Sequence, residues 1–403
     1  MSLFNSMTTA ISGMNAQSRA LGHISDNVAN SQTVGFKRTD TNFEDLLTQS
    51  SSRIHTPGAV SATPEATVSL QGSLEMVDNP LSIALSGNGL LSVAQPAGRN
   101  PDGSVAFENQ QLFTRAGDFR KDSSGYLVNG SGYALQGWSA DANGVVNQGP
   151  LSPIHVDETP IAAQPTTKAA LTANLPKTPA STDPIKTQFQ IYNPAGDLKT
   201  VQLSWAAGGA PNTWTATASD GTTNLSSQTL TFDPVTGAAA PGSALTFTGD
   251  FGQGSQTVTL DLSDVTQHAG TVYEQSKITV DGETSGAFRA VAIRDSGDVV
   301  VSYDNGASRT IAKVPVVTFS NPDALQRMDG QAFGLSSEAG PMQVQSAGTK
   351  GAGTLSAGAV EHSNVDIAAE FTKLIVAQRA YTANTRIVTT TDQMLEETIN
   401  MRR

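Results

Sequence analysis

Residues 361–403 read EHSNVDIAAEFTKLIVAQRAYTANTRIVTTTDQMLEETINMRR and contain neither glycine nor proline after Val365. One apolar row recurs every seven residues: Ile367, Leu374, Tyr381, Val388 and Leu395. A second row lies beside it: Ala380, Ile387, Met394 and Met401. An apolar stripe held over about four heptads predicts a long helix with one seam that faces a partner.

The remaining seam positions are small or polar. They are Ala377, Asn384, Thr391 and Thr398. Threonine is a weak helix former because its branched Cβ restricts χ1, so this helix is expected to be marginal alone and to need neighbours. Two interpretations stay open from this stretch by itself: an ordinary amphipathic helix that lies on its own domain, or an element that packs against other chains.

The opposite end of the chain shows the same pattern. From Leu3 to Val28 the heptad positions are Met7, Met14, Leu21 and Val28. Gly13 and Gly22 interrupt this predicted helix, and each costs roughly 1 kcal/mol relative to alanine. Two marginal amphipathic helices at opposite ends predict that the ends meet and close one another's seams.

The composition favours β-domains with many turns. The chain has 403 residues, with 37 glycines and 19 prolines, and only 15% are charged. This length suits two or three domains. The net charge of −12, without a basic block, makes nucleic acid an improbable partner. There is no cysteine, which excludes disulfides and thiolate chemistry. No apolar run is long enough to insert into a membrane, and no cleaved signal peptide is expected.

The middle of the chain predicts short strands. Residues 76–149 and 275–360 carry hairpin signals such as Asn129-Gly130 and are interpreted as one discontinuous β-domain. Residues 150–274 begin with proline-rich joints and continue as an alternating series, which predicts an inserted β-sandwich or barrel. The expected fold class is therefore multidomain and mainly β, with terminal helices over 1–30 and 361–403 that pair. Residues 31–75 are polar and irregular, and by themselves favour a flexible linker.

No stretch indicates catalysis. The five histidines stand singly, without metal-ligand spacing. Gly87-Asn-Gly89 lacks the third glycine of a dinucleotide loop, and Asp141-Ala-Asn143-Gly144 lacks the carboxylates of a calcium loop, so both are interpreted as turns. Paired carboxylates of the glycosidase type leave no spacing rule and stay open. We expect a protein that is not an enzyme, with no cofactor, no metal and no catalytic residue.

Two motifs resemble a known family. Residues 24–37, ISDNVANSQTVGFK, are similar to the N-terminal signature of the bacterial flagellar axial proteins, the rod, hook and hook-associated subunits. Residues 361–384 resemble the matching C-terminal signature. The signature turn comprises Asn27, Asn30, Thr33, Gly35 and Phe36. Hook subunits are the best match, because shorter rod proteins lack an inserted β-domain.

The resemblance implies a structural subunit that self-assembles into a curved, flexible tube, a universal joint that transmits torque from rod to filament and encloses an export channel. The terminal helices are expected to line the inner tube, and the family implies that residues 31–75 are an extended, ordered connector. Implied partners are further copies of the chain, the distal rod protein, the hook cap, the hook-filament junction proteins and the flagellar export apparatus. The implied location is the extracellular hook, on the basal-body side.

Three alternatives remain. The nearest is a distal rod or hook-filament junction protein, and the others are a secreted β-domain adhesin and a β-sandwich hydrolase. Neither of the last two gives a reason for paired helical ends. Tubes seen by electron microscopy after overexpression would favour a polymer. We further expect the two helical ends to be disordered in the free monomer and to fold on assembly.

Overall fold

The computed structural model describes residues 3–50, 55–101, 104–142, 144–179, 181–270 and 272–401. The chain divides into two compact units. The first comprises Met1–Asp157, Val291–Val301 and Arg309–Arg403, and the second comprises Glu158–Ala290 and Ser302–Ser308. The expected insert over 150–274 therefore differs at both ends: the second unit begins at Glu158 and continues past 274. The proline-rich joints before Glu158 belong to the first unit, and β21 (Glu274–Val280) pairs with β13 (Lys168–Pro176) in the second.

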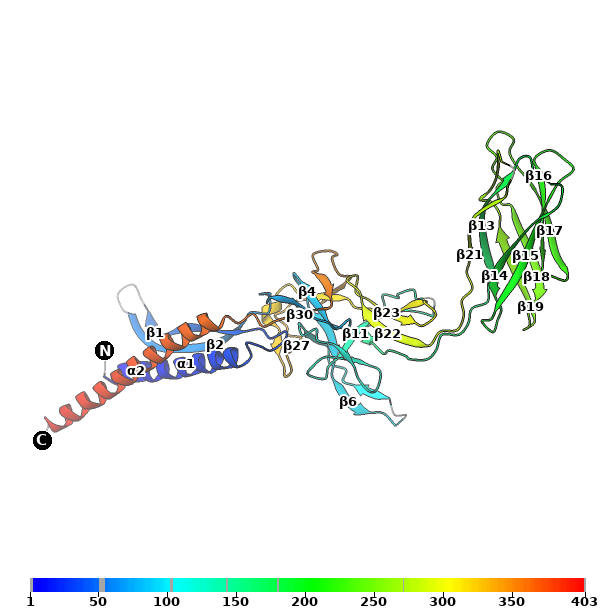
Figure 1. Ribbon diagram of the computed structural model, residues 1–403. Helices are drawn as coiled ribbons and strands as arrows, with labels where there is room; N and C mark the ends of the chain where they lie inside the picture. Colours follow the sequence, from blue (N-terminus) through cyan, green and yellow to red (C-terminus); the bar gives the residue numbers. More distant parts are fainter. Residues whose placement is uncertain are drawn as a thin grey trace. The chain divides into compact units, whose positions relative to one another are not determined.

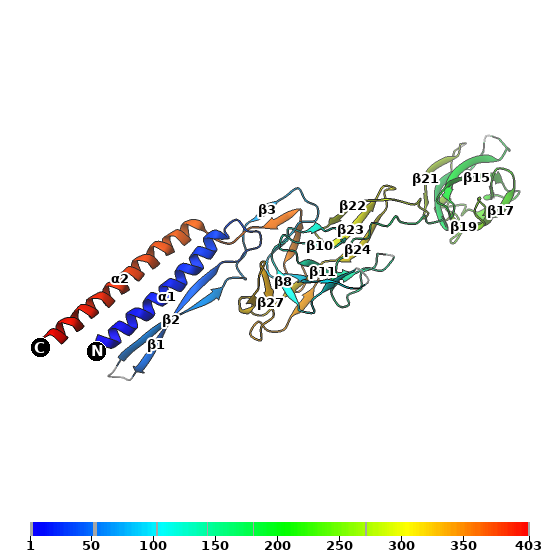
Figure 2. The ribbon, with the colours of Figure 1, turned by 90° about the horizontal axis from the view of Figure 1, so that it is seen from below.

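The two ends of the chain form a helical pair. Helix α1 (Leu3–Ala29) and helix α2 (Ile367–Asn400) run antiparallel side by side, so that the two termini lie at the same end (Figures 1 and 2). Asp366 caps α2, because its carboxylate accepts hydrogen bonds from the backbone N–H groups of Ala368 and Ala369. Of the helices in the described ranges, neither is long and apolar enough to cross a membrane. The prediction that the terminal helices pair is confirmed.

A β-hairpin packs along α1 and approaches the first turns of α2. Strands β1 (Thr39–Ser50) and β2 (His55–Ala66) pair in antiparallel register from Thr39–Ala66 outward (Figure 2). Its backbone accepts hydrogen bonds from α1: the hydroxyl of Thr9 donates to Gly58 O, and Arg19 donates to Ala62 O. Interpreting 31–75 from composition as a flexible linker missed this hairpin. Its side chains are too polar to mark strands, and its order depends on ladder bonds and on contacts with α1.

The β-part of the first unit is built from short strands, many of which form one eleven-stranded sheet. One core cluster joins Phe113, from before the second unit, to Val317 and Phe333, from after it. The strands before the second unit are β3 (Leu74–Met76), β4 (Ile83–Ser86), β5 (Leu91–Ala94), β6 (Pro96–Arg99), β7 (Val105–Phe107), β8 (Leu112–Thr114), β9 (Arg120–Lys121), β10 (Leu127–Val128), β11 (Ala134–Ser139) and β12 (Ser152–Pro153). Those after it are β22 (Phe288–Ile293), β23 (Asp298–Tyr303), β24 (Ser308–Lys313), β25 (Val316–Thr318), β26 (Gln326–Arg327), β27 (Ala332–Gly334), β28 (Gln343–Gln345), β29 (Thr354–Ala357) and β30 (Ala359–Glu361), with the short 3-10 helix η1 (Pro322–Ala324) between β25 and β26.

The second unit is a β-sandwich. One sheet has the order β14-β15-β16-β17, and the other contains β18, β19, β13, β20 and β21. Side chains alternate strictly between buried and less buried along β16, and Trp205, Phe247 and Leu260 from both sheets share one core. The strands are β14 (Ile185–Tyr192), β15 (Leu198–Ala207), β16 (Thr213–Ser219), β17 (Asn224–Thr231), β18 (Ala244–Asp250), β19 (Ser255–Asp261) and β20 (Val265–His268), together with β13 and β21. The expected fold class, mainly β and multidomain, is confirmed.

Candidate assembly site at the two chain ends

The contact between α1 and α2 is a seam of small and polar residues. Asn27 donates a hydrogen bond to the buried Glu370 carboxylate over 3.1 Å. One heptad further along each helix, Ala20 and Ala377 are both buried. One heptad beyond them, Gly13 faces Asn384. Ala377 and Asn384, two of the small or polar seam positions of the sequence, thus lie in the contact with the chain's own α1, whereas Thr398 is exposed.

Close approach explains the residue types in this seam. A Cβ added to Gly13 would lie 2.7 Å from Nδ2 of Asn384, closer than unbonded atoms approach. Alanine and glycine let helix backbones come near one another and leave the few polar groups to pair across the seam. Gly13 therefore serves the packing, whereas a Cβ at Gly22 would meet no atom within 4 Å.

The predicted interface residues lie beside this seam rather than at its centre. Met7, Met14, Leu21 and Val28 are half-buried along α1, and Leu374, Val388 and Leu395 are half-buried along α2. Ile367 and Tyr381 are exposed. The structure brings the α1 and α2 rows to neighbouring flanks, where the hydroxyl of Thr385 contacts the sulfur of Met14. Whether these rows contact another subunit stays a prediction.

Several large apolar side chains of α2 are exposed. Phe371 is 51% exposed, Val376 62% and Ile387 46%. Beyond the start of α1, where α2 runs on alone, Ile399 and Met401 are exposed as well (Figure 1). Scattered exposed apolar residues are common on proteins, but Val376, Ile387 and Met401 share one side of the helix, and such an exposed apolar side indicates a surface that binds another molecule.

A groove of about 620 Å³ opens where α1, α2 and β1 meet. Its apolar lining includes Ile24 and Val376. At one side Lys373 bridges the elements, since its ammonium lies 2.6 Å from the Asp40 carboxylate on β1 and 2.8 Å from Glu370 on its own helix. This ion pair fixes the hairpin relative to α2.

The signature turn carries the chain from α1 to the hairpin. Asn27 is buried, and its side chain donates to Thr39 O and accepts from Thr39 N, which joins the two ends of the turn. Asn30 folds back on Asp26 and also accepts from the hydroxyl of Thr33. Gly35 has φ +68°, and a Cβ there would lie 2.3 Å from the backbone of Ala116. The turn thus needs glycine at 35 for two reasons, conformation and space.

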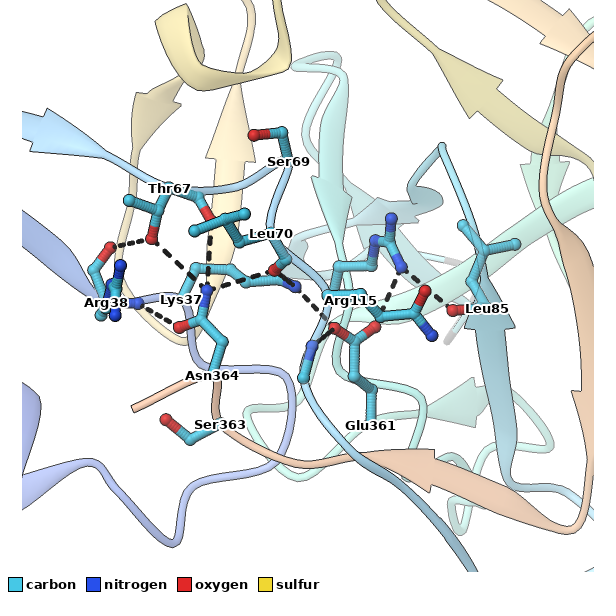
Figure 3. Close-up of polar contacts among 12 residues, drawn as sticks. Lys37, Arg38, Thr67, Ser69, Leu70, Leu85, Arg115, Glu361, Ser363 and Asn364 are labelled. Carbon is cyan, nitrogen blue, oxygen red and sulfur yellow. Dashed lines mark hydrogen bonds and ion pairs between the residues drawn. The ribbon is translucent and has the colours of Figure 1, made fainter. Parts of the chain in front are cut away.

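Residues 35–39, here called the N-terminal arm, are held by three distant segments. Gly35 N donates to Glu361 O, and Arg38 N donates to the side chain of Asn364. Asn364 in turn donates to Thr67 O and Leu70 O (Figure 3). On the other side, Arg327 stacks over the Phe36 ring at 4.4 Å and donates to Lys37 O.

At the centre of these contacts lies a buried ion cluster (Figure 3). The Glu361 carboxylate lies 2.5 Å from Lys37 Nζ through Oε1 and 2.9 Å from an Arg115 guanidinium nitrogen through Oε2. Side-chain exposure is 1% for Lys37, 0% for Glu361 and 3% for Arg115. Backbone carbonyls complete the shell: Lys37 donates to Leu70 O, while Arg115 donates to Leu85 O and Gly87 O. Gly72 N donates to the carboxylate as well.

Burial works against the two cations of the cluster. Desolvation lowers the pKa of Lys37 and that of Arg115 below their ordinary values, while the Glu361 carboxylate opposes both shifts. Lys37 and Glu361 both lie in the family motifs, but the sequence did not predict this cluster. Its members are separated by 324 and 246 positions in the chain, and no local pattern marks such a contact.

Comparison with known proteins agrees with this architecture. Three family descriptions match: "Flagella basal body rod protein" over residues 7–37, "Flagellar hook protein FlgE/F/G D1 domain" over 84–169 and "Flagellar basal body rod FlgEFG protein C-terminal" over 356–401. "Flagellar hook protein FlgE" of Brucella abortus is 33% identical over the whole of both chains. The protein of that name from Rhizobium meliloti is 30% identical, again over the whole of both chains.

A solved structure shares the fold. The Helicobacter pylori flagellar hook protein FlgE2 superposes with a TM-score of 0.52 at 14% identity, covering 70% of this chain and 98% of the other. Together with the paired terminal helices and the full-length relatives, this likeness confirms the expected resemblance. The chain belongs to the flagellar hook protein FlgE family and is a structural subunit of the flagellar hook.

Proposed function

We propose that this hook subunit polymerises through the apolar rows of its terminal helices, and that the resulting tube is a flexible joint that transmits torque from rod to filament around an export channel. The observation that supports the proposal most is that α2 carries two different kinds of surface. Small and polar residues close the seam with α1, while large apolar side chains such as Phe371 and Ile387 stay exposed in the single chain.

The energetics favour association. Burying a large apolar side chain contributes roughly 1.5–3 kcal/mol relative to leaving it exposed, so a few of the α2 side chains suffice to offset the entropy lost on association. The proposed contact surface comprises the row Ile367, Leu374, Tyr381, Val388 and Leu395, the neighbouring α2 row that contains Ile387, and Met7, Met14, Leu21 and Val28 on α1. Leu374, Val388 and Leu395 contribute less new burial than Ile367 and Tyr381, because they are already half-buried.

The helical pair is a candidate for folding on assembly. Its seam contains only small apolar surfaces, and marginal helices need neighbours for stability. We propose that α1 and α2 are disordered in the free monomer and ordered in the tube. Hydrogen exchange on the free monomer tests this idea: strong protection from Leu374 to Leu395 before polymerisation would contradict it.

The wider assembly follows from the family. We infer that the chain contacts further copies of itself, the distal rod protein, the hook cap, the hook-filament junction proteins and the flagellar export apparatus. We infer an extracellular location, in the hook on the basal-body side. In the proposed tube the helical pair forms the inner layer and the two β-parts form the outer layers, where the many threonine-lined strand surfaces suit exchangeable polar contacts.

The decisive experiment places a charge on the exposed face of α2. Ile387→Asp is expected to block tube formation, which electron microscopy detects. The β-part of the first unit and the second unit should stay folded, which circular dichroism detects. Ile387 is exposed, so the substitution spares the seam with α1. Gln378→Asp is the matched control, because it adds the same charge at an exposed position that is already polar. Normal tubes from Ile387→Asp would overturn the proposed surface.

Leu374→Asp and Tyr381→Asp extend the experiment to the predicted row. Both are expected to abolish polymerisation, but only Tyr381 is exposed enough to isolate the contact between subunits. A rod or junction role is the nearest alternative. Bulk assembly of the purified chain into long tubes favours the hook role, whereas assembly limited to short stacks favours a rod or junction protein.

A further inference from the structure

We propose that Lys37 is a checkpoint residue, which means that it makes docking of the N-terminal arm conditional on Glu361. The arm docks on the β-part of the first unit only after strand β30 has formed and placed the Glu361 carboxylate in the cluster. The inference concerns how the chain closes on itself, and it holds whether or not the chain polymerises. It rests on the geometry of the buried cluster formed by Lys37, Arg115 and Glu361.

The first step is the charge count. The cluster holds two cations and one carboxylate, and all three side chains are at most 3% exposed. Within the described residues, Glu361 is the carboxylate that bonds both cations, each through its own oxygen. Without Glu361, two positive charges would share a site closed to water. Breaking a buried ion pair by removing one partner is strongly unfavourable, because the other charge remains buried and uncompensated.

The second step is connectivity. Arg115 belongs to the loop after β8, inside the β-part of the unit, and bonds the backbone at Leu85 and Gly87. Glu361 is the last residue of β30, which pairs with β3. Lys37 comes from the arm and bonds Oε1, the carboxylate oxygen that Arg115 does not bond and that also accepts from Gly72 N, and it lies next to Leu70 O. The pocket for its ammonium is therefore complete only when β3 and β30 have paired.

The third step separates a checkpoint from a simple stabilising contact. The arm has other anchors that do not involve the Lys37 ammonium: Gly35 N to Glu361 O, Arg38 N to Asn364 and the stacking of Arg327 on Phe36. A methionine at 37 fills a similar volume without charge, so these anchors suffice to seat the arm. After this substitution Glu361 remains paired with Arg115, so no buried charge is left uncompensated. Lys37 thus adds little affinity, but makes docking conditional on Glu361.

The test is a double-mutant cycle on the full-length chain. The amides of Gly35 and Arg38 report docking of the arm, because they donate to Glu361 and to Asn364. Their hydrogen exchange is measured under ionic conditions in which the wild-type amides are protected. Glu361→Gln is expected to speed their exchange on the order of a hundredfold. Amides of β15 and β16, in the second unit, serve as the internal control and should not change.

Lys37→Met is expected to change the exchange rate of the arm amides by less than about threefold. The double variant Lys37→Met/Glu361→Gln should return this rate to within about tenfold of the wild-type rate, because the cluster again carries a single net charge. Arm amides that stay protected in Glu361→Gln would overturn the proposal. If the arm amides of the double variant exchange as fast as those of Glu361→Gln alone, the proposal is overturned too. The loss of protection would then come from the changed shape of the carboxylate site and not from the unpaired ammonium.

Discussion

Gly13 and Asn384 face each other so closely across the α1–α2 seam that a Cβ on residue 13 would lie 2.7 Å from Nδ2 of Asn384. The two residues belong to opposite ends of the chain, and their contact sets how near the two helices approach. It also gives a physical reason for a glycine in the middle of a helix, where glycine otherwise costs about 1 kcal/mol relative to alanine.

Gly13→Ala and Gly22→Ala form a matched pair. Gly22→Ala meets no neighbour and is expected to stabilise the helical pair by up to about 1 kcal/mol. Gly13→Ala should lose that gain, because Asn384 has to turn away. Hydrogen exchange of α1 and α2 in assembled protein measures both effects. Gly13→Ala/Asn384→Ala should recover the gain, and equal stabilisation by both single variants would show that the seam is not tightly packed.

Trp205→Ala tests the independence of the two units. Trp205 is fully buried in the core of the sandwich, and its truncation is expected to cost about 3–5 kcal/mol. Calorimetry should show the loss in the transition of the second unit only. Trp138→Ala, in the first unit, is the reciprocal control. A parallel loss of stability in both units from either variant would argue for a single cooperative fold.

The hydrogen bonds of Asp281 predict that the second unit loses stability at acidic pH. Its carboxylate accepts hydrogen bonds from the backbone N–H groups of Thr167 and Lys168 and from the hydroxyl of Thr167. Burial opposes ionisation, but these bonds outweigh it and lower the pKa of Asp281 below its ordinary value. The stabilisation is therefore present above the ordinary pKa and is lost as the pH falls through the folded-state value.

Asp281→Asn is expected to destabilise the second unit by about 1 kcal/mol near neutral pH and to have a smaller effect as the pH falls below about 4. Denaturant unfolding followed by tryptophan fluorescence measures the difference. Asp264→Asn, at an exposed position of the same unit, is the control for the loss of one negative charge. A difference between wild type and Asp281→Asn that does not depend on pH would exclude the carboxylate as its source.

The ion pairs of Lys373 predict that the helical pair loses stability at alkaline pH, opposite to the acid dependence expected for the second unit. Burial alone would lower the pKa of Lys373, but its bonds to Asp40 and Glu370 outweigh burial and raise it. The ion pairs therefore stabilise the pair fully below the ordinary lysine pKa, and this contribution is lost as the pH rises through the raised value. Because the side chain is 43% exposed, the contribution is modest, about 0.5–1 kcal/mol.

Lys373→Met should loosen the hairpin from α2 at neutral pH, seen as faster exchange of the β1 amides near Asp40. The difference from wild type should shrink as the pH rises above the ordinary lysine pKa and through the raised pKa of Lys373. Arg386→Met removes a cation from an exposed position of the same helix and provides the control. If both variants loosen the hairpin equally, the net charge of α2 is responsible rather than the Lys373 bridge.

Much of the architecture could be predicted from local patterns. Heptad rows marked both terminal helices, and alternation with turn residues marked the strands of the sandwich, because both signals repeat within a few residues. The hairpin over 39–66 was not predicted from such patterns, because its strands carry proline, glycine and charged residues. Ladder hydrogen bonds and contacts from Thr9 and Arg19 hold it instead. Side-chain patterns do not report such contacts.

The sequence by itself determined that the two ends are helical, that they carry apolar rows and that the middle is β-structure. It also carried the signatures of the family, because these depend only on the order of residues. Only the tertiary structure decided which helix face meets which partner. The small residues at 13, 20, 377 and 384 turned out to form the seam within the chain, which leaves the apolar rows on its flanks. It alone brought Lys37, Arg115 and Glu361 together, because a buried charge selects its partner by distance in space and not by distance along the chain.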